Sequence, residues 1–477
     1  MGNFAIKIGE TFRMDRLVGN TLPATIGELI LEPDGGVRYL VRDAATDVLV
    51  FEVASWASVI SMPPVGPLDD QGRIMLGAVD GVFSFIDHSS GVPVEVGIVT
   101  NHVWADVRIV VLPGPVYRLD IQPESLGVIP LFFAGDDTVV LGAGDDVFYD
   151  YGGNLEMTLG GGHDEAWLYE AQGAVTFKEV YGGGGNDTIN YQGGNGEIYG
   201  GSGRDVIRPA GGNHGAWTLV GGAGNDTVDG YAGPGTVIVD GDNSGNDVYS
   251  GNRDTVLSYA GATGGLLVDM GAARVFGTTT GTDRLAGNVG VISRFVGSQA
   301  ADTMLGGTTG DGVVFDGQGG ADSLIGSVED DWLIGRAGAD TLVGHHGDDT
   351  LDGGVGNDVI IGGDGADRLR GGAGADVFVY LSTADSTPGY AGRDRIVDFN
   401  PLQDRIDLSA IDARANTLAH DTFTFIGTAA FTAAGQLRFE HIGNTTVVTA
   451  NTKGFGGAEM RIDLTGLHAL TEDHFLL

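Results

Sequence analysis

Aspartate residues recur every nine positions in the middle of the chain, and this spacing is the feature that could do chemistry. From Gly326 the sequence reads in strict nines: GSVEDDWLI, GRAGADTLV, GHHGDDTLD, GGVGNDVII, GGDGADRLR and GGAGADVFV. Position six of each unit is aspartate, and position eight is apolar, from Leu333 to Phe378. Carboxylates at a fixed period in a repeating fold form rows, and rows of negative charge attract cations.

Upstream of Gly326 the same pattern continues less regularly. Asp302 and Asp311 keep the spacing of nine, and the units GGGGNDTIN, GGSGRDVIR and GGAGNDTVD lie between residues 182 and 229. The position-six residues that we expect to bind a metal are Asp187, Asp205, Asp226, Asp302, Asp311, Asp322, Asp331, Asp340, Asp349, Asp358, Asp367 and Asp376.

Each nonapeptide predicts one turn and one short strand. The G-G-x-G-x-D half needs backbone conformations that glycine adopts at little cost, and the following x-apolar-x half places one side chain inward. Two nonapeptides then make a coil of eighteen residues, and successive coils stack as parallel strands ~4.8 Å apart. The chain is therefore predicted to be all-β, with a parallel β-roll in which Asp331 lies over Asp349 and Asp340 over Asp358.

The stacked aspartates indicate calcium as the metal. Two carboxylates ~5 Å apart repel by roughly 3 kcal/mol at an effective dielectric constant of ~20, so a cation must lie between the coils. Calcium takes six to eight oxygen ligands, and a glycine turn offers carbonyl oxygens beside the carboxylate, whereas magnesium needs a stricter cage. Zinc prefers His or Cys. His345 and His346 are adjacent in a turn, so we expect a tolerated substitution there rather than a histidine site.

Two resemblances extend this prediction. The repeats resemble the RTX (hemolysin-type) calcium-binding pattern G-G-x-G-x-D-x-U-x. Residues 394–399 and 404–409, DRIVDF and DRIDLS, look like the C-terminal domain of serralysin-type secreted metalloproteases. That resemblance implies a β-rich cap on the roll, a type I secretion signal in the closing residues 472–477, a type I exporter as partner and an extracellular location.

Composition excludes several classes of function. The net charge is −39, so the chain repels nucleic acid and anionic membranes. Glycine accounts for 84 of 477 residues, and cysteine is absent, so metal replaces disulfides as the staple. We expect no membrane span and no Sec-type signal peptide. The H-E-x-x-H, G-x-S-x-G and Walker motifs are absent, which disfavours the metalloprotease, lipase and nucleotide-binding classes.

The predicted organisation has five parts. Residues 1–130 alternate polar and apolar positions and predict an N-terminal antiparallel β domain. Residues 131–254 predict an irregular roll, 255–296 a non-repeat insertion or wider coil, 297–380 the regular roll, and 381–477 the cap. Polar candidates in the first part are Asp69, Asp70, Asp87, His88, Glu95 and His102.

Three functional hypotheses remain open at this point. The leading one is an extracellular protein, not an enzyme, whose N-terminal domain binds a cell-surface or polysaccharide ligand and whose roll is held together by several calcium ions. A secreted polysaccharide- or lipid-acting enzyme, with its site in residues 1–254, is the first alternative. The second is a surface-layer or matrix protein in which the roll itself assembles.

Overall fold

The computed structural model describes an all-β chain with two short 3-10 helices among its described residues. It describes the backbone of strands β1–β10 and, with side chains, residues 145–477 apart from short gaps. The gaps are 146, 151–153, 170–175, 212–214, 231–235, 240–244, 278–280, 287–291, 309–311, 416, 418 and 455–456, and the side chains of 147, 149 and 239. The chain divides into two compact units, residues 1–236 and 237–477.

Unit 1 begins with an antiparallel sheet, as the alternating pattern predicted. The strand order is β1-β2-β3-β4-β6-β7, and each neighbouring pair is antiparallel. The strands are β1 (Thr11–Arg13), β2 (Thr25–Leu31), β3 (Val37–Asp43), β4 (Leu49–Ser55), β6 (Gly81–Asp87) and β7 (Val94–Asn101). Short strands β5 (Arg73–Met75), β8 (Arg108–Val110) and β9 (Arg118–Asp120) then begin parallel pairing.

The rest of unit 1 is a parallel roll with two stacks of strands. One stack contains β10 (Asp136–Val140), β12 (Asn154–Gly161), β14 (Phe177–Gly184), β16 (Asn195–Ser202) and β18 (Trp217–Ala223). The other contains β11 (Val147–Asp150), β13 (Glu165–Leu168), β15 (Thr188–Tyr191), β17 (Val206–Pro209) and β19 (Thr227–Gly230). Every pair of neighbours in each stack is parallel.

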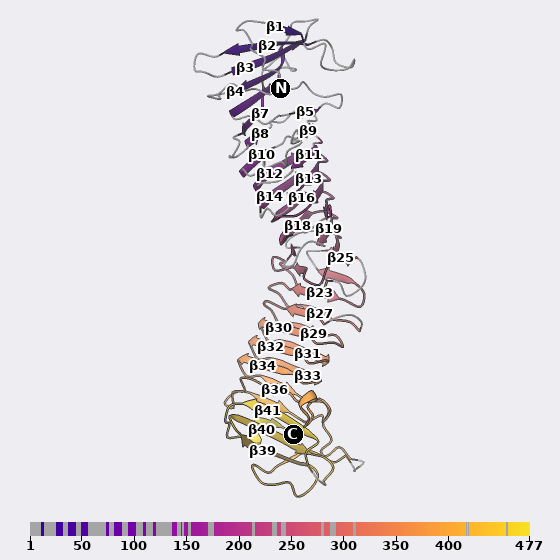
Figure 1. Ribbon diagram of the computed structural model, residues 1–477. Helices are drawn as coiled ribbons and strands as arrows, with labels where there is room; N and C mark the ends of the chain where they lie inside the picture. Colours follow the sequence, from indigo (N-terminus) through magenta and orange to yellow (C-terminus); the bar gives the residue numbers. More distant parts are fainter. Residues whose placement is uncertain are drawn as a thin grey trace. The chain divides into compact units, whose positions relative to one another are not determined.

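Unit 2 repeats this architecture, and Figure 1 shows its even-numbered strands β30–β34 along one side and β31 and β33 along the other. The first stack contains β20 (Val237–Val239), β22 (Val256–Ser258), β26 (Arg294–Val296), β28 (Val314–Asp316), β30 (Trp332–Ala337), β32 (Thr350–Val355), β34 (Arg368–Ala373) and β36 (Arg395–Ile396). The second contains β21 (Val248–Gly251), β27 (Thr303–Leu305), β29 (Ser323–Ile325), β31 (Thr341–His346), β33 (Val359–Asp364), β35 (Val377–Val379), β37 (Arg405–Asp407) and β42 (Phe475–Leu476).

Two regions of unit 2 depart from the parallel repeat. The strands β23 (Leu266–Asp269), β24 (Arg274–Gly277) and β25 (Gly281–Leu285) form antiparallel hairpins within the stretch that lacks the nonapeptide period. At the end of the chain, β39 (Gln436–Ile442), β40 (Thr445–Asn451) and β41 (Met460–Thr465) form an antiparallel sheet, and β38 (Thr424–Phe425) pairs with β39. The 3-10 turns are η1 (Tyr390–Gly392) and η2 (Glu472–His474).

The position-eight side chains form the core of the regular roll. Leu333, Leu351 and Leu369 stack along one face and Leu342 and Ile360 along the other, and each is at most 1% exposed. One inward side chain per short strand removes apolar area from water at every coil, and this burial favours stacking. Among the described residues, no helix is long and apolar enough to cross a membrane.

Replacing a single core leucine should weaken the whole stack. We expect Leu351→Ala to lower the free energy of unfolding of the calcium-loaded protein by about 2–5 kcal/mol, because the cavity leaves contacts unmade on both neighbouring coils. Val355, which is 63% exposed on the same strand, is the matched control, and Val355→Ala should change stability by less than ~0.5 kcal/mol. Urea unfolding in saturating calcium measures both variants, and equal shifts contradict the assignment of the core.

Candidate metal sites

The position-six aspartates lie at the turns between strands and are linked from coil to coil. The backbone N–H of Asp331 donates to Asp349 Oδ1 at 2.8 Å, and that of Asp340 donates to Asp358 Oδ1 at 2.9 Å. Repetition of this bond produces two rows in unit 2. The first row is Asp302, Asp322, Asp340, Asp358, Asp376 and Asp404, and the second is Asp331, Asp349, Asp367 and Asp394.

Unit 1 has one comparable row among its described residues. The backbone N–H of Asp164 donates to Asp187 Oδ1, that of Asp187 to Asp205 Oδ1, and that of Asp205 to Asp226 Oδ1, at 2.8–2.9 Å. The turns at the opposite edge use Asn154 and Asn195, whose Oδ1 atoms accept backbone N–H groups of the next coil. Because asparagine carries no charge, that edge stacks without a row of carboxylates.

The second carboxylate oxygen distinguishes most of these aspartates from ordinary hydrogen-bonded ones. It is buried and has no hydrogen-bond partner, and a buried carboxylate oxygen without a donor or cation is costly. The position-six residues whose Oδ2 is open in this sense are Asp187, Asp205, Asp322, Asp340, Asp349, Asp358, Asp367 and Asp376.

The first glycine of each repeat leaves room beside the open oxygen. A Cβ built on Gly344 would lie 2.1 Å from Asp349 Oδ2 and 2.5 Å from the carbonyl oxygen of Gly362 in the next coil. At Gly353 the corresponding distances are 2.4 Å to Asp358 Oδ2 and 2.8 Å to the carbonyl oxygen of Gly371. The absence of a side chain therefore lets a carboxylate and a carbonyl from neighbouring coils converge.

This donor set fits calcium better than the alternatives. Carboxylate and backbone carbonyl oxygens are the ligands that calcium takes in flexible sites. No group of three or more His, Cys, Asp or Glu side chains suited to a metal occurs in the described part of the chain, so each site must rely on carbonyl oxygens. Zinc, which requires several such side chains, does not fit.

Burial shifts the acidity of the open carboxylates toward neutral pH. Burial raises the pKa of Asp349 to about 8, and the charges of Asp367 and Asp331 in the same row add to the rise. Burial likewise raises the pKa values of Asp205, Asp322 and Asp367 to about 7 and that of Asp358 to about 6. Protonation or a cation must therefore compensate the burial of these carboxylates.

Three of the expected metal ligands differ from the others. Two have no open carboxylate oxygen, and the third lies outside the described residues. In Asp302 and Asp331 both carboxylate oxygens accept hydrogen bonds, and Ser298 and Ser327 respectively supply the N–H bonds to Oδ2. Asp311 lies outside the described residues. The N-terminal candidates Asp69, Asp70, His88 and His102 also lie outside them, as do the side chains of Asp87 and Glu95.

Asp394 and Asp404 join the rows although neither was predicted as a ligand. The backbone N–H of Asp367 donates to Asp394 Oδ1, and that of Asp376 donates to Asp404 Oδ1, both at 3.1 Å. The buried carboxyl of Asp394 interacts with the hydroxyl of Tyr380, whereas Asp404 Oδ2 accepts the N–H of Asn400. Their offsets of 27 and 28 residues break the period of 18. Asp394 still falls on the count of nines, three units after Asp367, whereas Asp404 does not. The available signal is local: both begin the sequence D-R-I, which matches the D-x-apolar end of a repeat.

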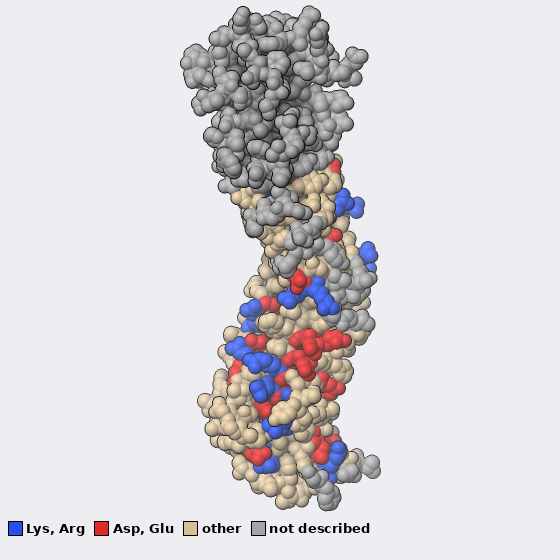
Figure 2. All heavy atoms as spheres, in the orientation of Figure 1, with Lys and Arg blue, Asp and Glu red and all other residues tan. Residues whose placement is uncertain are grey.

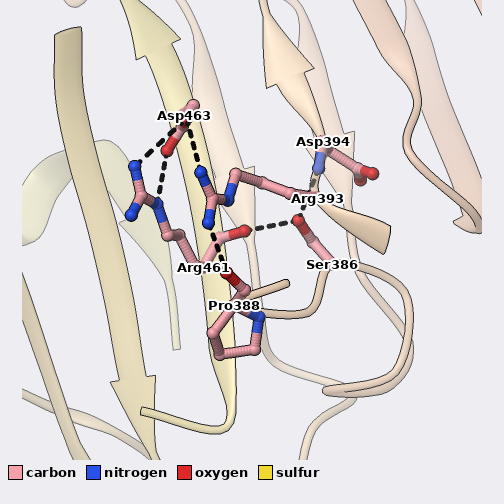
Figure 3. Close-up of polar contacts among 6 residues, drawn as sticks. All are labelled: Ser386, Pro388, Arg393, Asp394, Arg461 and Asp463. Carbon is pink, nitrogen blue, oxygen red and sulfur yellow. Dashed lines mark hydrogen bonds and ion pairs between the residues drawn. The ribbon is translucent and has the colours of Figure 1, made fainter. Parts of the chain in front are cut away.

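A polar network in the C-terminal region holds Asp394 in place (Figure 3). Ser386 Oγ accepts the backbone N–H of Asp394 at 2.9 Å and donates to the carbonyl oxygen of Arg461 on β41 at 2.5 Å. The nearly buried Asp463 pairs with Arg461 at 2.7 Å and with Arg393 at 3.6 Å. Residues far apart in sequence thus fix the last member of the second row.

Position five carries a separate, exposed set of contacts. Asp330 Oδ1 accepts the N–H of Asp348, and Asp348 Oδ1 accepts that of Ala366. Figure 2 shows Asp and Glu gathered over the part of unit 2 that contains β31 and β33. His346 belongs to this surface and pairs with Asp364 at 3.2 Å, while His345 occupies the turn with φ 79°.

Comparison with known proteins agrees with both resemblances in the sequence. Residues 285–477 match the family model described as Peptidase M10 serralysin C terminal. Residues 133–166, 179–198 and 218–237 match the model of the RTX calcium-binding nonapeptide repeat. No curated protein matches the chain.

Solved structures with detectable similarity cover parts of the chain. The AlgE6 R2 subunit of the Azotobacter vinelandii mannuronan C5-epimerase is 29% identical over 32% of this chain and 92% of its own, with a TM-score of 0.25. The R3 subunit of the same enzyme is 31% identical over 32% of this chain and 77% of its own, with a TM-score of 0.16. The extracellular lipase LipA of Serratia marcescens is 16% identical over 65% of this chain and 41% of its own, with a TM-score of 0.16. TM-scores this low establish neither a common arrangement nor a common activity.

The raised pKa values predict that acid stabilises the calcium-free roll. A carboxyl whose pKa is higher in the folded than in the unfolded chain binds more protons when folded, so stability is greatest below the unfolded value near ~4 and is lost as the pH rises through about 6–8. Protein dialysed free of calcium should show more β structure by far-UV circular dichroism at pH 5 than at pH 8. In calcium the midpoint concentration should instead rise at pH 5, because protons compete for the same oxygens. Identical calcium-free spectra at the two pH values contradict this account.

Proposed function

We propose that this chain, which carries RTX calcium-binding nonapeptide repeats and a serralysin-type C-terminal domain, is an exported protein whose roll folds when it binds calcium outside the cell. The observation that carries the proposal is the rows of buried Oδ2 atoms without partners, most of them beside a carbonyl oxygen of the next coil. Carboxylate and carbonyl oxygens are the ligands that calcium requires. The chain has a net charge of −39, and its stacked carboxylates repel one another unless a cation lies between them.

The residues of each coil divide the work of folding. The N–H of one aspartate binds Oδ1 of the next and fixes the register, the position-eight side chain fills the core, and the first glycine keeps the space beside Oδ2 open. Calcium, when bound, supplies the positive charge that the open carboxylates lack. The free energy of metal binding then adds directly to the free energy of folding.

The N-terminal sheet is the part that we propose meets a ligand. Strands β1–β4, β6 and β7 form an antiparallel sheet that differs from the repeating coils, and the sequence carries no recognised catalytic motif. A calcium-stabilised roll that presents this sheet suits binding or adhesion to a cell-surface or polysaccharide ligand. Retention of the calcium-loaded chain on intact cells or immobilised polysaccharide, compared with a chain lacking residues 1–130, tests this role.

Calcium should convert the repeats from unfolded to folded. A site with a dissociation constant of ~10⁻⁴ M contributes about 1.4 kcal/mol at ~10⁻³ M calcium, and several sites together match the stability of a domain. We expect the far-UV spectrum at pH 8 to change from disordered to β between chelator and 10 mM calcium, while 10 mM magnesium leaves it disordered. A spectrum that does not change with calcium contradicts the proposed function.

Export should require the closing residues of the serralysin-type domain. Residues 472–477 form η2 and β42, and Phe475 is buried against Phe425 with ring centroids 5.3 Å apart. Deletion of Phe475–Leu477 should remove the protein from the medium of a host that has a matching type I exporter. Ile406→Ala is the control, because it loosens the paired strand β37 but leaves the terminal sequence intact. Equal amounts of truncated and full-length protein in the medium contradict the export proposal.

A further inference from the structure

The residue four positions before each position-six aspartate adopts one of two backbone conformations. Before each of the open position-six aspartates, this residue has a positive φ in the left-handed region, from 70° to 110°. These residues are Gly183, Gly201, Gln318, Arg336, His345, Gly354, Gly363 and Gly372. The corresponding residues Ser298, Ser327, Leu381 and Asn400, which precede Asp302, Asp331, Asp385 and Asp404, are not left-handed. Tyr390, four positions before Asp394, lies in the 3-10 turn η1 and not in a turn between strands, so Asp394 does not enter this comparison.

The second conformation directs a backbone N–H at the carboxylate. Ser298 N–H donates to Asp302 Oδ2 at 2.7 Å, and Ser327 N–H donates to Asp331 Oδ2 at 2.5 Å. The same bond runs over the same four residues from Leu381 to Asp385 at 2.6 Å and from Asn400 to Asp404 at 2.7 Å. An N–H group in this position occupies the oxygen that a metal would otherwise bind.

At the two serines the side chain completes the closure. Ser298 Oγ donates to Asp302 Oδ1 and Ser327 Oγ to Asp331 Oδ1, each at 2.9 Å. The N–H groups of Leu266 and Val313 donate to the same two Oδ1 atoms at 2.8 Å and 2.7 Å. Each carboxylate thus accepts three hydrogen bonds, which stabilise its charge inside the protein without a cation.

We propose that the conformation of the residue four positions before a repeat aspartate decides whether that aspartate binds calcium, and that Ser298 and Ser327 keep Asp302 and Asp331 free of metal. The proposal rests on the calcium-binding function proposed above and assigns specific residues to it. A left-handed residue turns its N–H away from Oδ2 and leaves that oxygen to the metal. Serine in ordinary backbone geometry closes the site.

The positions of the closed aspartates support this assignment. Asp302 and Asp331 are the first members of the two rows in unit 2, and Asp404 is the last member of the first row. The closed aspartates therefore mark ends of the rows. A Cβ built on Gly326 would lie 2.2 Å from Asp331 Oδ2 and 2.8 Å from the carbonyl oxygen of Gly344, much as at Gly344 beside Asp349, so the hydrogen bonds from Ser327 are what distinguish the closed site.

The open aspartates hold their conformation even where glycine is absent. Gln318, Arg336 and His345 have φ values of 70°, 74° and 79°, which residues with a Cβ rarely adopt. Arg336 and His345 are held by parallel pairing with Gly354 and Gly363 of the following coils. These three residues precede Asp322, Asp340 and Asp349. Because a positive φ costs free energy at a residue with a Cβ, its presence at all three favours a functional role for the open conformation.

Counting bound calcium ions in matched variants of the full chain tests the proposal. Asp331→Asn should leave the number of ions per chain unchanged, whereas Asp349→Asn, in the same row, should lower it by at least one. Ser327→Gly should add one ion, because glycine permits the left-handed conformation, and Asp331→Asn in that background should remove it. His345→Ser should remove an ion, and His345→Gly should keep it. Equilibrium dialysis with elemental analysis gives the count, and circular dichroism in 10 mM calcium confirms that each variant folds.

The outcomes separate this proposal from the function on which it rests. If the wild-type chain binds no calcium, the proposed function itself is wrong. If the wild type binds calcium but Asp331→Asn loses an ion as Asp349→Asn does, the assignment of closed and open aspartates is wrong. The assignment is also wrong if a folded Ser327→Gly protein binds no additional ion. The Asp331→Asn comparison stands alone should the glycine variant fail to fold.

Discussion

The rest of the structure depends on the repulsion between carboxylates that the fold places one coil apart. Parallel strands fix that separation at about 5 Å, and the backbone bond from each aspartate to the next prevents the side chains from moving apart. The opposing contribution is the burial of one apolar side chain per strand, such as Leu351 or Ile360. Each added coil brings both the repulsion between carboxylates and the burial of apolar side chains. The free energy of folding therefore depends on the balance of these two contributions in each coil, and a cation between the coils shifts that balance toward folding.

Two glycines of the repeat serve different parts of this balance. The first glycine has no side chain to collide with the open Oδ2 of its own repeat, as at Gly344 beside Asp349. The second supplies a left-handed turn, with φ 105° at Gly363 before Asp367, whose Oδ2 accepts no hydrogen bond. Close approach of neighbouring coils is a further reason for glycine, since a Cβ on Gly354 or Gly356 would lie 2.2 Å or 1.3 Å from a backbone carbonyl oxygen of the preceding coil.

The sequence predicted the repeating coils because a strict period of nine carries its own evidence at every unit. It also predicted which aspartates stack, since Asp331 and Asp349 are two repeats apart. It could not show that Asp331 is closed by Ser327, because a serine at that place reads as a tolerated variation until the N–H direction is known. Nor could it show that Asp367 bonds to Asp394, three units on, rather than to Asp385, two units on, or extend the first row to Asp404, which is off the count of nines. Periodicity records spacing along the chain, whereas ligand geometry depends on conformation within each turn.

The two units face this constraint to different degrees. In the described part of unit 1, one edge of the roll carries aspartates, and the other uses the neutral amides of Asn154 and Asn195 to make the same bond between coils. Unit 2 carries aspartate rows on both edges of its regular coils, so each coil there adds two buried charges. The electrostatic cost per coil is accordingly higher in unit 2, so the proposed function predicts that its folding depends more steeply on calcium. The region that matches the serralysin C-terminal model belongs to unit 2 and holds Asp394 through Ser386, so the second row of aspartates ends within that region. On the proposed function, such a chain is extended where calcium is scarce and gains most of its order where calcium is plentiful.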